Sequence, residues 1–212
     1  MSENYKESFE KTRKAGVIAA GALDEVSKII KPGISTHDID KICYEYIKDH
    51  GAFSAPLFYR GFPNSCCTST NHVVCHGIPS DKILKEGDII NVDVTALKDG
   101  WHGDTSRTFK IGDVSVKAKK LVKITYESMM KAIKIVKEDI HLGDIGAAIQ
   151  EHVEAEGFSV VQDFCGHGIG ESFHKEPNVL HYGKKETGEK IKAGMIFTIE
   201  PMINAGDYQT KT

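Results

Sequence analysis

Two stretches of the chain carry the same helical pattern of apolar residues, 106 positions apart, a shift that places Asp38 on Asp144. Apolar side chains recur in both stretches at the i, i+3, i+4, i+7, i+8 spacing of one helix face. A glycine ends each stretch, and glycine often follows the last turn of a helix. The two stripes are Ile39, Ile42, Cys43, Tyr46 and Ile47, and Ile145, Ala148, Ile149, His152 and Val153.

A longer helix is predicted before each of these stretches, over 5–30 and over 116–137. In the second, one face carries Val122, Tyr126, Met129, Ile133 and Val136. Strand-rich sequence follows each helix pair, at 73–75 and 89–110 in the first half and at 159–164 and 196–203 in the second. The pattern is therefore helix, helix, strands, repeated once. It predicts a single α+β domain over 1–212, with a pseudo-two-fold axis and a site between the halves.

The composition of the 212 residues is that of an ordinary globular protein, with 40% hydrophobic and 27% charged residues and a formal net charge of −3. No basic stripe with interleaved aromatic residues indicates nucleic-acid binding. No leader-like apolar segment begins the chain, and no stretch approaches the roughly 18 apolar residues of a membrane span. The five cysteines are an odd number without framework spacing, so we expect reduced thiols and a cytoplasmic protein.

A β-hairpin presents the first candidate ligands. Asp93 interrupts a β-branched run at 89–95, and Asp99-Gly100 is a two-residue turn signal. With that turn, Thr95 faces Asp104, and Asp93 points to the same side as Asp104. Diagonal neighbours across a sheet lie about 7–8 Å apart, so two such carboxylates could hold metal ions. A solvated hairpin face with two aspartates is the alternative.

Three histidines stand in turns punctuated by glycine or proline. His167 has a glycine on each side, His174 follows in a probable loop, and His76 ends a predicted strand at 73–75. Flanking glycines allow a ligand or another backbone to approach closely. We expect the other seven histidines to be surface or helix-face residues: His37, His50, His72, His102, His141, His152 and His181.

Glu200 ends a short apolar strand pattern at 195–201, where an unpaired carboxylate would be costly to bury. Two aspartates, one glutamate and one histidine suit divalent Mn, Fe, Co or Zn better than a thiolate-rich zinc site does. A pair of such ions can lower the pKa of a bound water and polarise a carbonyl. The candidate ligands therefore point to metal-assisted hydrolysis.

Six motifs, spread in order over nearly the whole chain, resemble those of the type I methionine aminopeptidases, metallopeptidases with the pita-bread fold. They lie at 73–79, 91–95, 102–106, 166–170, 173–177 and 197–202. Type I is favoured over type II by the short segment between His174 and Glu200. Prolidase and aminopeptidase P share the fold but carry an additional N-terminal domain, and here the first predicted helix begins near Met1.

The resemblance implies two divalent metal ions and assigns their ligands. Asp93 is a bidentate ligand of one ion, and Asp104 is a bridging carboxylate. His167 and Glu200 ligate the other ion, and Glu200 also accepts a proton from the nucleophilic water. The ions are Co, Mn, Fe or Zn.

The resemblance also implies which residues meet the substrate. His76 and His174 contact it and stabilise the tetrahedral intermediate. Tyr59, Phe62, Cys67 and Phe173 match the pocket for the methionine side chain, although a core role is equally natural for these four. Pro56 stands where some members of the family carry a cysteine.

One implied ligand has no counterpart in this sequence. The family has a second bridging glutamate on a strand downstream of the Glu200 motif, and only 201–212 follow here. We therefore expect one metal ion to bind better than two, and activity to be impaired. A pita-bread module that binds peptide without cleaving it is the alternative.

The function that the resemblance implies is removal of the initiator methionine from nascent polypeptides, chiefly where the second residue is small. Nascent polypeptide N-termini, met at the ribosome, are then the partners. We expect a cytoplasmic monomer that recognises neither nucleic acid nor membrane.

Overall fold

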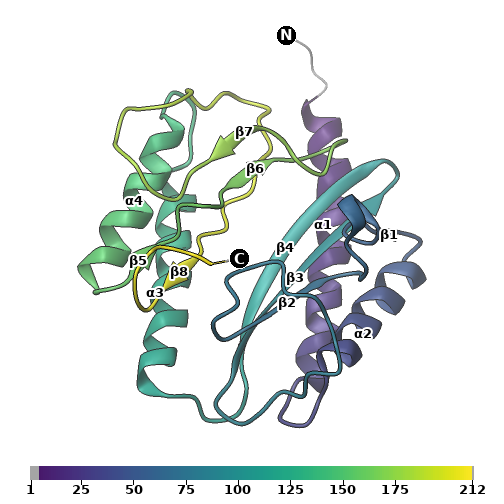
Figure 1. Ribbon diagram of the computed structural model, residues 1–212. Coiled ribbons are helices and arrows are strands. Elements are labelled where there is room, and N and C mark those ends of the chain that lie inside the picture. Colours follow the sequence, from purple (N-terminus) through teal and green to yellow (C-terminus); the bar gives the residue numbers. More distant parts are fainter. Residues whose placement is uncertain (1–4, 212) are drawn as a thin grey trace. The chain divides into compact units, whose positions relative to one another are not determined.

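The computed structural model describes residues 5–211 (Figure 1). The contacts divide the chain into two compact units. Unit 1 is Met1–Ser115 with Gly170–Phe173, and unit 2 is Val116–Ile169 with His174–Thr212. The single domain over 1–212 stays a prediction, and its first four residues and Thr212 lie outside the described residues.

Unit 1 packs two helices against an antiparallel four-stranded sheet. β3 is the central strand: β4 pairs along its whole length, and β1 and β2 pair with its two ends on the other edge. The long helix α1 lies against β3 and β4 (Figure 1). The elements are α1 (Tyr5–Ile29), α2 (Thr36–Asp49), β1 (Phe53–Ser54), the 3-10 turn η1 (Tyr59–Gly61), β2 (Cys67–Thr70), β3 (Ile89–Lys98) and β4 (Trp101–Lys110).

The register of the β3–β4 hairpin confirms the one predicted from Asp99-Gly100. Lys98 pairs with Trp101, and Thr95 pairs with Asp104. Alternate residues of β3 enter the core under α1 and α2, and Asp93 stands between two of them on the opposite face. The core residues of β3 are Ile90, Val92, Val94 and Ala96, each with no exposed surface.

The predicted strand at 73–75 is wrong, because the chain turns at Asn71 immediately after β2. Asn71 has a φ of 54°, and its side-chain oxygen accepts a hydrogen bond from the backbone of Ile89 at 3.0 Å. The chain then returns beside β2 as an irregular segment, in which the Gly77 oxygen accepts from the Thr68 N–H at 2.7 Å. His76, with a φ of 55°, therefore lies in this segment and not at a strand end.

Unit 2 pairs two helices with two short two-stranded sheets. β5 pairs with β8, and β6 pairs with β7, a strand that the sequence pattern did not predict. The predicted strands at 159–164 and 196–203 are shorter than expected: only Val160 and Ile203, with one neighbour each, form a ladder. The elements are α3 (Val116–Ile135), α4 (Leu142–Ala155), β5 (Ser159–Val160), β6 (Gly166–Gly168), β7 (Lys175–Val179) and β8 (Ile203–Asn204).

The predicted internal duplication is confirmed by the element bounds. A shift of 106 residues carries α2 onto α4 and β1 onto β5 with no change of length. The helix starts also match: the Asp38 carboxylate accepts the Ser35 N–H at 3.0 Å, and the Asp144 carboxylate accepts the His141 N–H at 2.8 Å. These side chains satisfy backbone donors that the first helical turn leaves unpaired.

The predicted apolar face of α3 is not the face that packs. Tyr126 is 60% exposed and Ile133 is 43% exposed, whereas Ile124, Ser128 and Ala132 are buried. The small side chains of Ser128 and Ala132 allow α3 to lie close against α4, its neighbour in unit 2. Such a face is only weakly hydrophobic in sequence, so the pattern favours the more apolar stripe.

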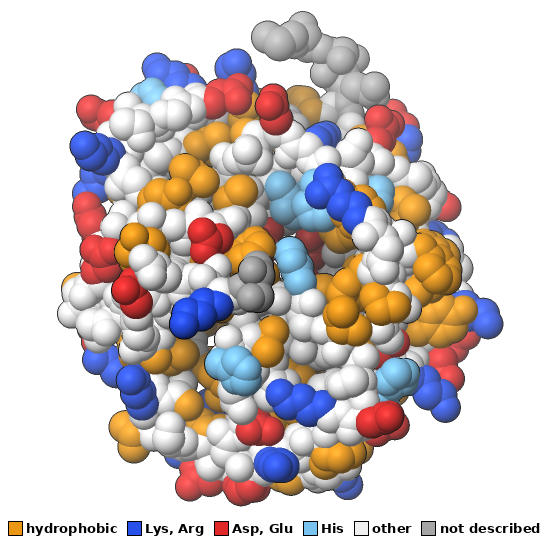
Figure 2. Space-filling model, in the orientation of Figure 1, with side chains coloured by type: hydrophobic (Ala, Val, Ile, Leu, Met, Phe, Trp, Pro, Cys, Tyr) orange, Lys and Arg blue, Asp and Glu red, His pale blue; other side chains and the backbone are white. Residues whose placement is uncertain are grey.

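Acidic and basic side chains are mixed over the face drawn in Figure 2. Within the helices, several acidic and basic side chains form exposed pairs, such as Lys11 with Glu7 at 2.8 Å. Pairs of this kind contribute at most about 1 kcal/mol each, so the buried apolar residues dominate the stability. Among residues 5–211, no helix has both the length and the hydrophobicity to cross a bilayer.

Candidate metal site

His167 is held in β6 by backbone that presses on both of its neighbours. A Cβ on Gly166 would lie 2.4 Å from the Thr198 oxygen, and a Cβ on Gly168 would lie 2.2 Å from the Glu176 oxygen. Only glycine tolerates such approaches. The close backbone approach predicted from these two glycines is thereby confirmed, and it fixes the position of the imidazole.

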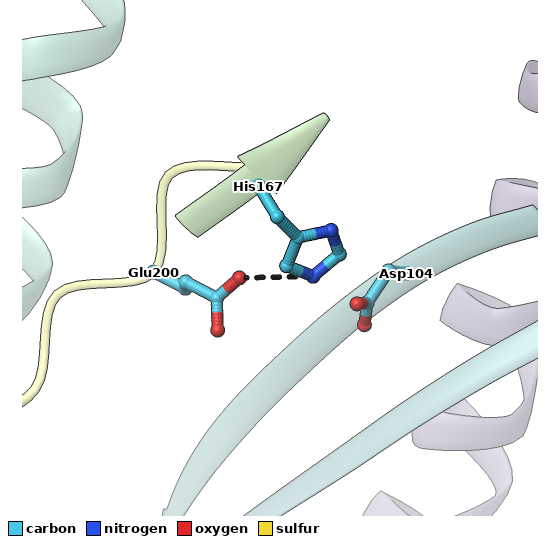
Figure 3. Close-up of side chains that lie close together, drawn as sticks. All are labelled: Asp104, His167 and Glu200. Atoms are coloured by element: carbon cyan, nitrogen blue, oxygen red, sulfur yellow. Dashed lines mark ion pairs between the residues drawn. The ribbon is translucent and has the colours of Figure 1, made fainter. Parts of the chain in front are cut away.

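The ring of His167 directs one nitrogen toward Glu200. Nδ1 lies 3.1 Å from the Gly168 oxygen, which can only accept, so Nδ1 carries the proton and donates. Nε2 lies 3.5 Å from Oε1 of Glu200 (Figure 3). A contact between Nε2 and a carboxylate oxygen is favourable only if the ring carries a second proton on Nε2 or if a cation lies between the two atoms. Two ligands about 2.0–2.2 Å from one ion would be separated by roughly this distance.

Thr198 connects the same two side chains. Its hydroxyl accepts the backbone N–H of His167 at 2.9 Å and donates to Oε1 of Glu200 at 2.5 Å. A hydrogen bond from a hydroxyl to a carboxylate is a strong contact that orients the carboxylate. One hydroxyl therefore sets the position of both candidate ligands in unit 2.

His181 is a part of this arrangement that sequence reasoning missed. We predicted a surface residue, but the side chain is completely buried, and its Nε2 accepts the Glu200 backbone N–H at 3.1 Å. Burial lowers the pKa of His181 to about 4, which keeps the ring neutral. The apolar run around it, Val179-Leu180-His181-Tyr182, is the one local signal of burial.

The candidate ligands of unit 1 lie on the hairpin. Asp104 pairs with Thr95, two residues from Asp93, and both carboxylates are half-buried. Cys67 lies directly opposite Asp93 on β2. Burial, followed by the charges of Asp93 and Asp104, raises the pKa of the Cys67 thiol well above its usual value. The thiol is therefore protonated and is not a charged group beside the two aspartates.

Asp93 and Glu200 occupy equivalent positions in the two units. In unit 1, Ala96 pairs with β1, and Asp93 stands three residues before it. In unit 2, Ile203 pairs with β5, and Glu200 again stands three residues before it. The duplication therefore places one carboxylate in each unit three residues before the paired residue.

Two further histidines lie beside these carboxylates and ligands. The ring centroid of His174 is 4.2 Å from that of His167. Partial desolvation lowers the pKa of His76, although its side chain is exposed, and the charge of Asp104 opposes the shift. Both imidazoles are therefore neighbours of a candidate metal ligand within their own unit.

The structure brings together two of the four predicted pocket residues by ring contact. The rings of Tyr59 and Phe173 are 5.0 Å apart, and His102 stacks on Phe173 at 5.5 Å. His102, predicted as a surface residue, is half-buried, and its Nδ1 lies 2.8 Å from the Gly170 oxygen.

The other two pocket residues are Phe62, for which no ring contact of this kind is found among the described residues, and Cys67, which has no ring. Phe62 is half-buried, and its backbone N–H donates to the Tyr59 oxygen at 2.9 Å. Cys67 is 8% exposed. All four pocket residues belong to unit 1. The candidate ligand Asp104, which Figure 3 also draws, belongs to the same unit.

Comparisons with known proteins agree with this chemistry. The model of metallopeptidase family M24 matches residues 10–210. The methionine aminopeptidase of Escherichia coli K12 is 54% identical over all of this chain and 81% of its own length.

Solved structures show the same fold. The methionine aminopeptidase of Rickettsia prowazekii superimposes with a TM-score of 0.96 at 52% identity, over 97% of this chain and 83% of that one. The prolidase of Pyrococcus furiosus, at 22% identity, reaches 0.79 over 94% of this chain and 59% of that one, which shows the fold alone. The predicted α+β pita-bread fold is confirmed, and the chain belongs to metallopeptidase family M24, among its methionine aminopeptidases.

Proposed function

We propose that this chain is a metal-dependent aminopeptidase that hydrolyses the N-terminal methionine from polypeptides, with preference for a small second residue. The observation that carries the proposal is the pair of His167 Nε2 and Glu200 Oε1, which lie 3.5 Å apart while Nδ1 of the same ring contacts a backbone oxygen. It is supported by relatives named methionine aminopeptidase that match nearly the whole chain.

The ligands we propose are Asp93, Asp104, His167 and Glu200. Carboxylate and imidazole donors fit Mn, Co, Fe or Zn, and the Nδ1–H bond of His167 to a backbone oxygen is the usual support of a ligating histidine. When bound, such ions lower the pKa of a water and polarise the scissile carbonyl. The expectation that one ion binds better than a second stays a prediction, which titration stoichiometry would test.

The remaining groups hold protons and substrate. Glu200 accepts a proton from the attacking water, with Thr198 fixing one of its oxygens. His76 and His174 donate to the substrate and to the oxyanion that forms at the carbonyl. The methionine side chain is received by the pocket residues Tyr59, Phe62, Cys67 and Phe173.

The proposed partners are nascent polypeptide N-termini, met at the ribosome, and the proposed state is a cytoplasmic monomer without nucleic-acid or membrane recognition. The support for a reducing compartment is that all five cysteines are free thiols.

Peptide selectivity tests the proposal. Purified chain loaded with Mn²⁺ or Co²⁺ is expected to release methionine from Met-Ala-Ser faster than from Met-Leu-Ser, and to leave Ala-Ala-Ser intact. Equal cleavage of all three peptides would indicate a different aminopeptidase. Binding of Met-Ala-Ser without release would favour the non-catalytic peptide-binding module, for which no present observation speaks.

A further inference from the structure

His181 is a fully buried histidine outside the proposed set of ligands and substrate contacts. Its Nδ1 has no hydrogen-bond partner among the described residues. Burying a polar N–H without a partner is unfavourable, and an apolar side chain of similar size would avoid the penalty. A compensating role would offset this penalty, and within residues 5–211 the imidazole makes one hydrogen bond, to the Glu200 backbone.

That bond fixes the tautomer of the ring. The backbone N–H of Glu200 can only donate, so Nε2 of His181, 3.1 Å away, must be the unprotonated acceptor. The proton of the neutral ring then sits on Nδ1. Protonation of Nε2 would place two donors face to face and break the contact.

Glu200 depends on this acceptor more than its counterpart Asp93 does. Asp93 lies in the middle of β3, paired with β2 on one side and β4 on the other. Glu200 lies outside any ladder, and the next residue, Pro201, has no N–H to donate. A side chain thus takes the place that a neighbouring strand has in unit 1.

The backbone around His181 rests directly on helix α4. A Cβ on Gly146 would lie 2.3 Å from the Tyr182 oxygen and 2.9 Å from the Leu180 oxygen. Glycine at this point of α4 therefore lets the segment 180–182 lie against the helix. Helix α4 therefore fixes the position of the imidazole, and the imidazole in turn holds the Glu200 backbone through its hydrogen bond.

From this geometry we propose that His181 is a positioning residue, whose Nε2 holds the Glu200 backbone so that its carboxylate is directed at the metal beside His167. The inference rests on the proposed metal-dependent function. It adds a group that touches neither metal nor substrate.

The tautomer can be read without metal. Long-range ¹H–¹⁵N NMR correlation of the metal-free chain is expected to show His181 with its proton on Nδ1 and an unprotonated Nε2. A proton on Nε2 would overturn the proposal, because that nitrogen could not then accept from Glu200.

Metal affinity tests the consequence. Calorimetric titration with Co²⁺ or Mn²⁺ compares the wild-type chain with His181→Leu, His181→Gln and His181→Asn. Loss of a group that orients a ligand typically weakens metal binding about 10–100-fold, which we expect for His181→Leu. The amide of Gln reaches the Nε2 position and is expected to restore much of the affinity, whereas the shorter Asn is not. The Co²⁺ absorption spectrum should differ more from wild type in His181→Leu and His181→Asn than in His181→Gln.

The outcomes separate the two proposals. A wild-type chain that binds neither ion refutes the proposed metal-dependent function itself. A wild-type chain that binds, with His181→Leu binding equally well and giving the same Co²⁺ spectrum, refutes the positioning role alone. The matched control is His37→Leu, a substitution at an exposed histidine of α2, which should leave affinity and spectrum unchanged.

Discussion

Thr198→Val removes the hydroxyl that forms hydrogen bonds with two candidate ligands, His167 and Glu200, and keeps the shape of the side chain. The hydroxyl accepts from the His167 N–H at 2.9 Å and donates to the Glu200 carboxylate at 2.5 Å. Valine is as compatible with an extended backbone as threonine, so we expect the variant to fold. The His167 N–H and the Glu200 carboxylate both lose a partner.

The magnitude follows from the charged bond. A hydrogen bond to an ionised group contributes about 1.5–3 kcal/mol. If the bond orients Glu200 for the metal, losing it weakens metal affinity by roughly 10–150-fold, at 1.4 kcal/mol for each factor of ten. The range agrees with the roughly 10–100-fold losses seen when groups that support a metal ligand are removed.

Calorimetric titration of metal-free protein with Mn²⁺ or Co²⁺ measures the effect. Thr198→Ser keeps the hydroxyl and is the matched control, with an affinity expected within about threefold of wild type. An equal loss in both variants would show that packing of the methyl group matters and not the hydroxyl. Wild-type affinity in Thr198→Val would refute the reasoning.

Three further predictions concern stability, measured by denaturant unfolding. Gly103→Ala would place a Cβ 2.0 Å from the Gly16 nitrogen in α1, so we expect a loss of at least about 1–3 kcal/mol, whereas Gly16→Ala, with open space at its Cβ, should stabilise by about 0.5–1 kcal/mol. A neutral result for Gly103→Ala would contradict the close packing of β4 on α1. Asp40→Ala leaves the backbone N–H of Ser65, bound at 2.8 Å, and two further donors without their acceptor, while the Ser65 hydroxyl keeps the Asp40 backbone oxygen, and should cost about 2–4 kcal/mol; a loss under about 0.5 kcal/mol would show that water replaces the carboxylate. His181, with its pKa lowered from 6.5 to about 4, resists protonation only in the folded state, so stability should fall by up to about 3 kcal/mol as the pH drops from about 6.5 to 4, and His181→Leu should lose that part of the acid sensitivity; an unchanged pH profile in the variant would contradict the buried neutral ring.

The parts of the fold that could be predicted are those set by local pattern. Asp99-Gly100 fixes the hairpin register, because a two-residue turn leaves one pairing of the strands. The 106-residue offset that relates Asp38 to Asp144 predicts that α2 and α4 are equivalent helices, and their bounds and N-terminal caps match. In the first case adjacent residues carry the signal, and in the second the chain repeats its own local pattern.

The parts that could not be predicted depend on contacts between residues distant in sequence. The packed face of α3 is decided by closeness to α4, where Ser128 and Ala132 are useful because they are small. His181 accepts its hydrogen bond only because the fold brings the Glu200 backbone to it. In the same way, His102 stacks on a ring only because the fold brings Phe173 to it. The bonds between such residues leave no periodicity in the sequence.

Release of free methionine from Met-Ala-Ser, followed while Mn²⁺ or Co²⁺ is titrated into metal-free chain, tests the central claim most directly. We expect no release without metal, release that rises and saturates as metal is added, and loss of that response in His167→Ala. Release that is independent of metal, or no release at any metal concentration, would contradict it.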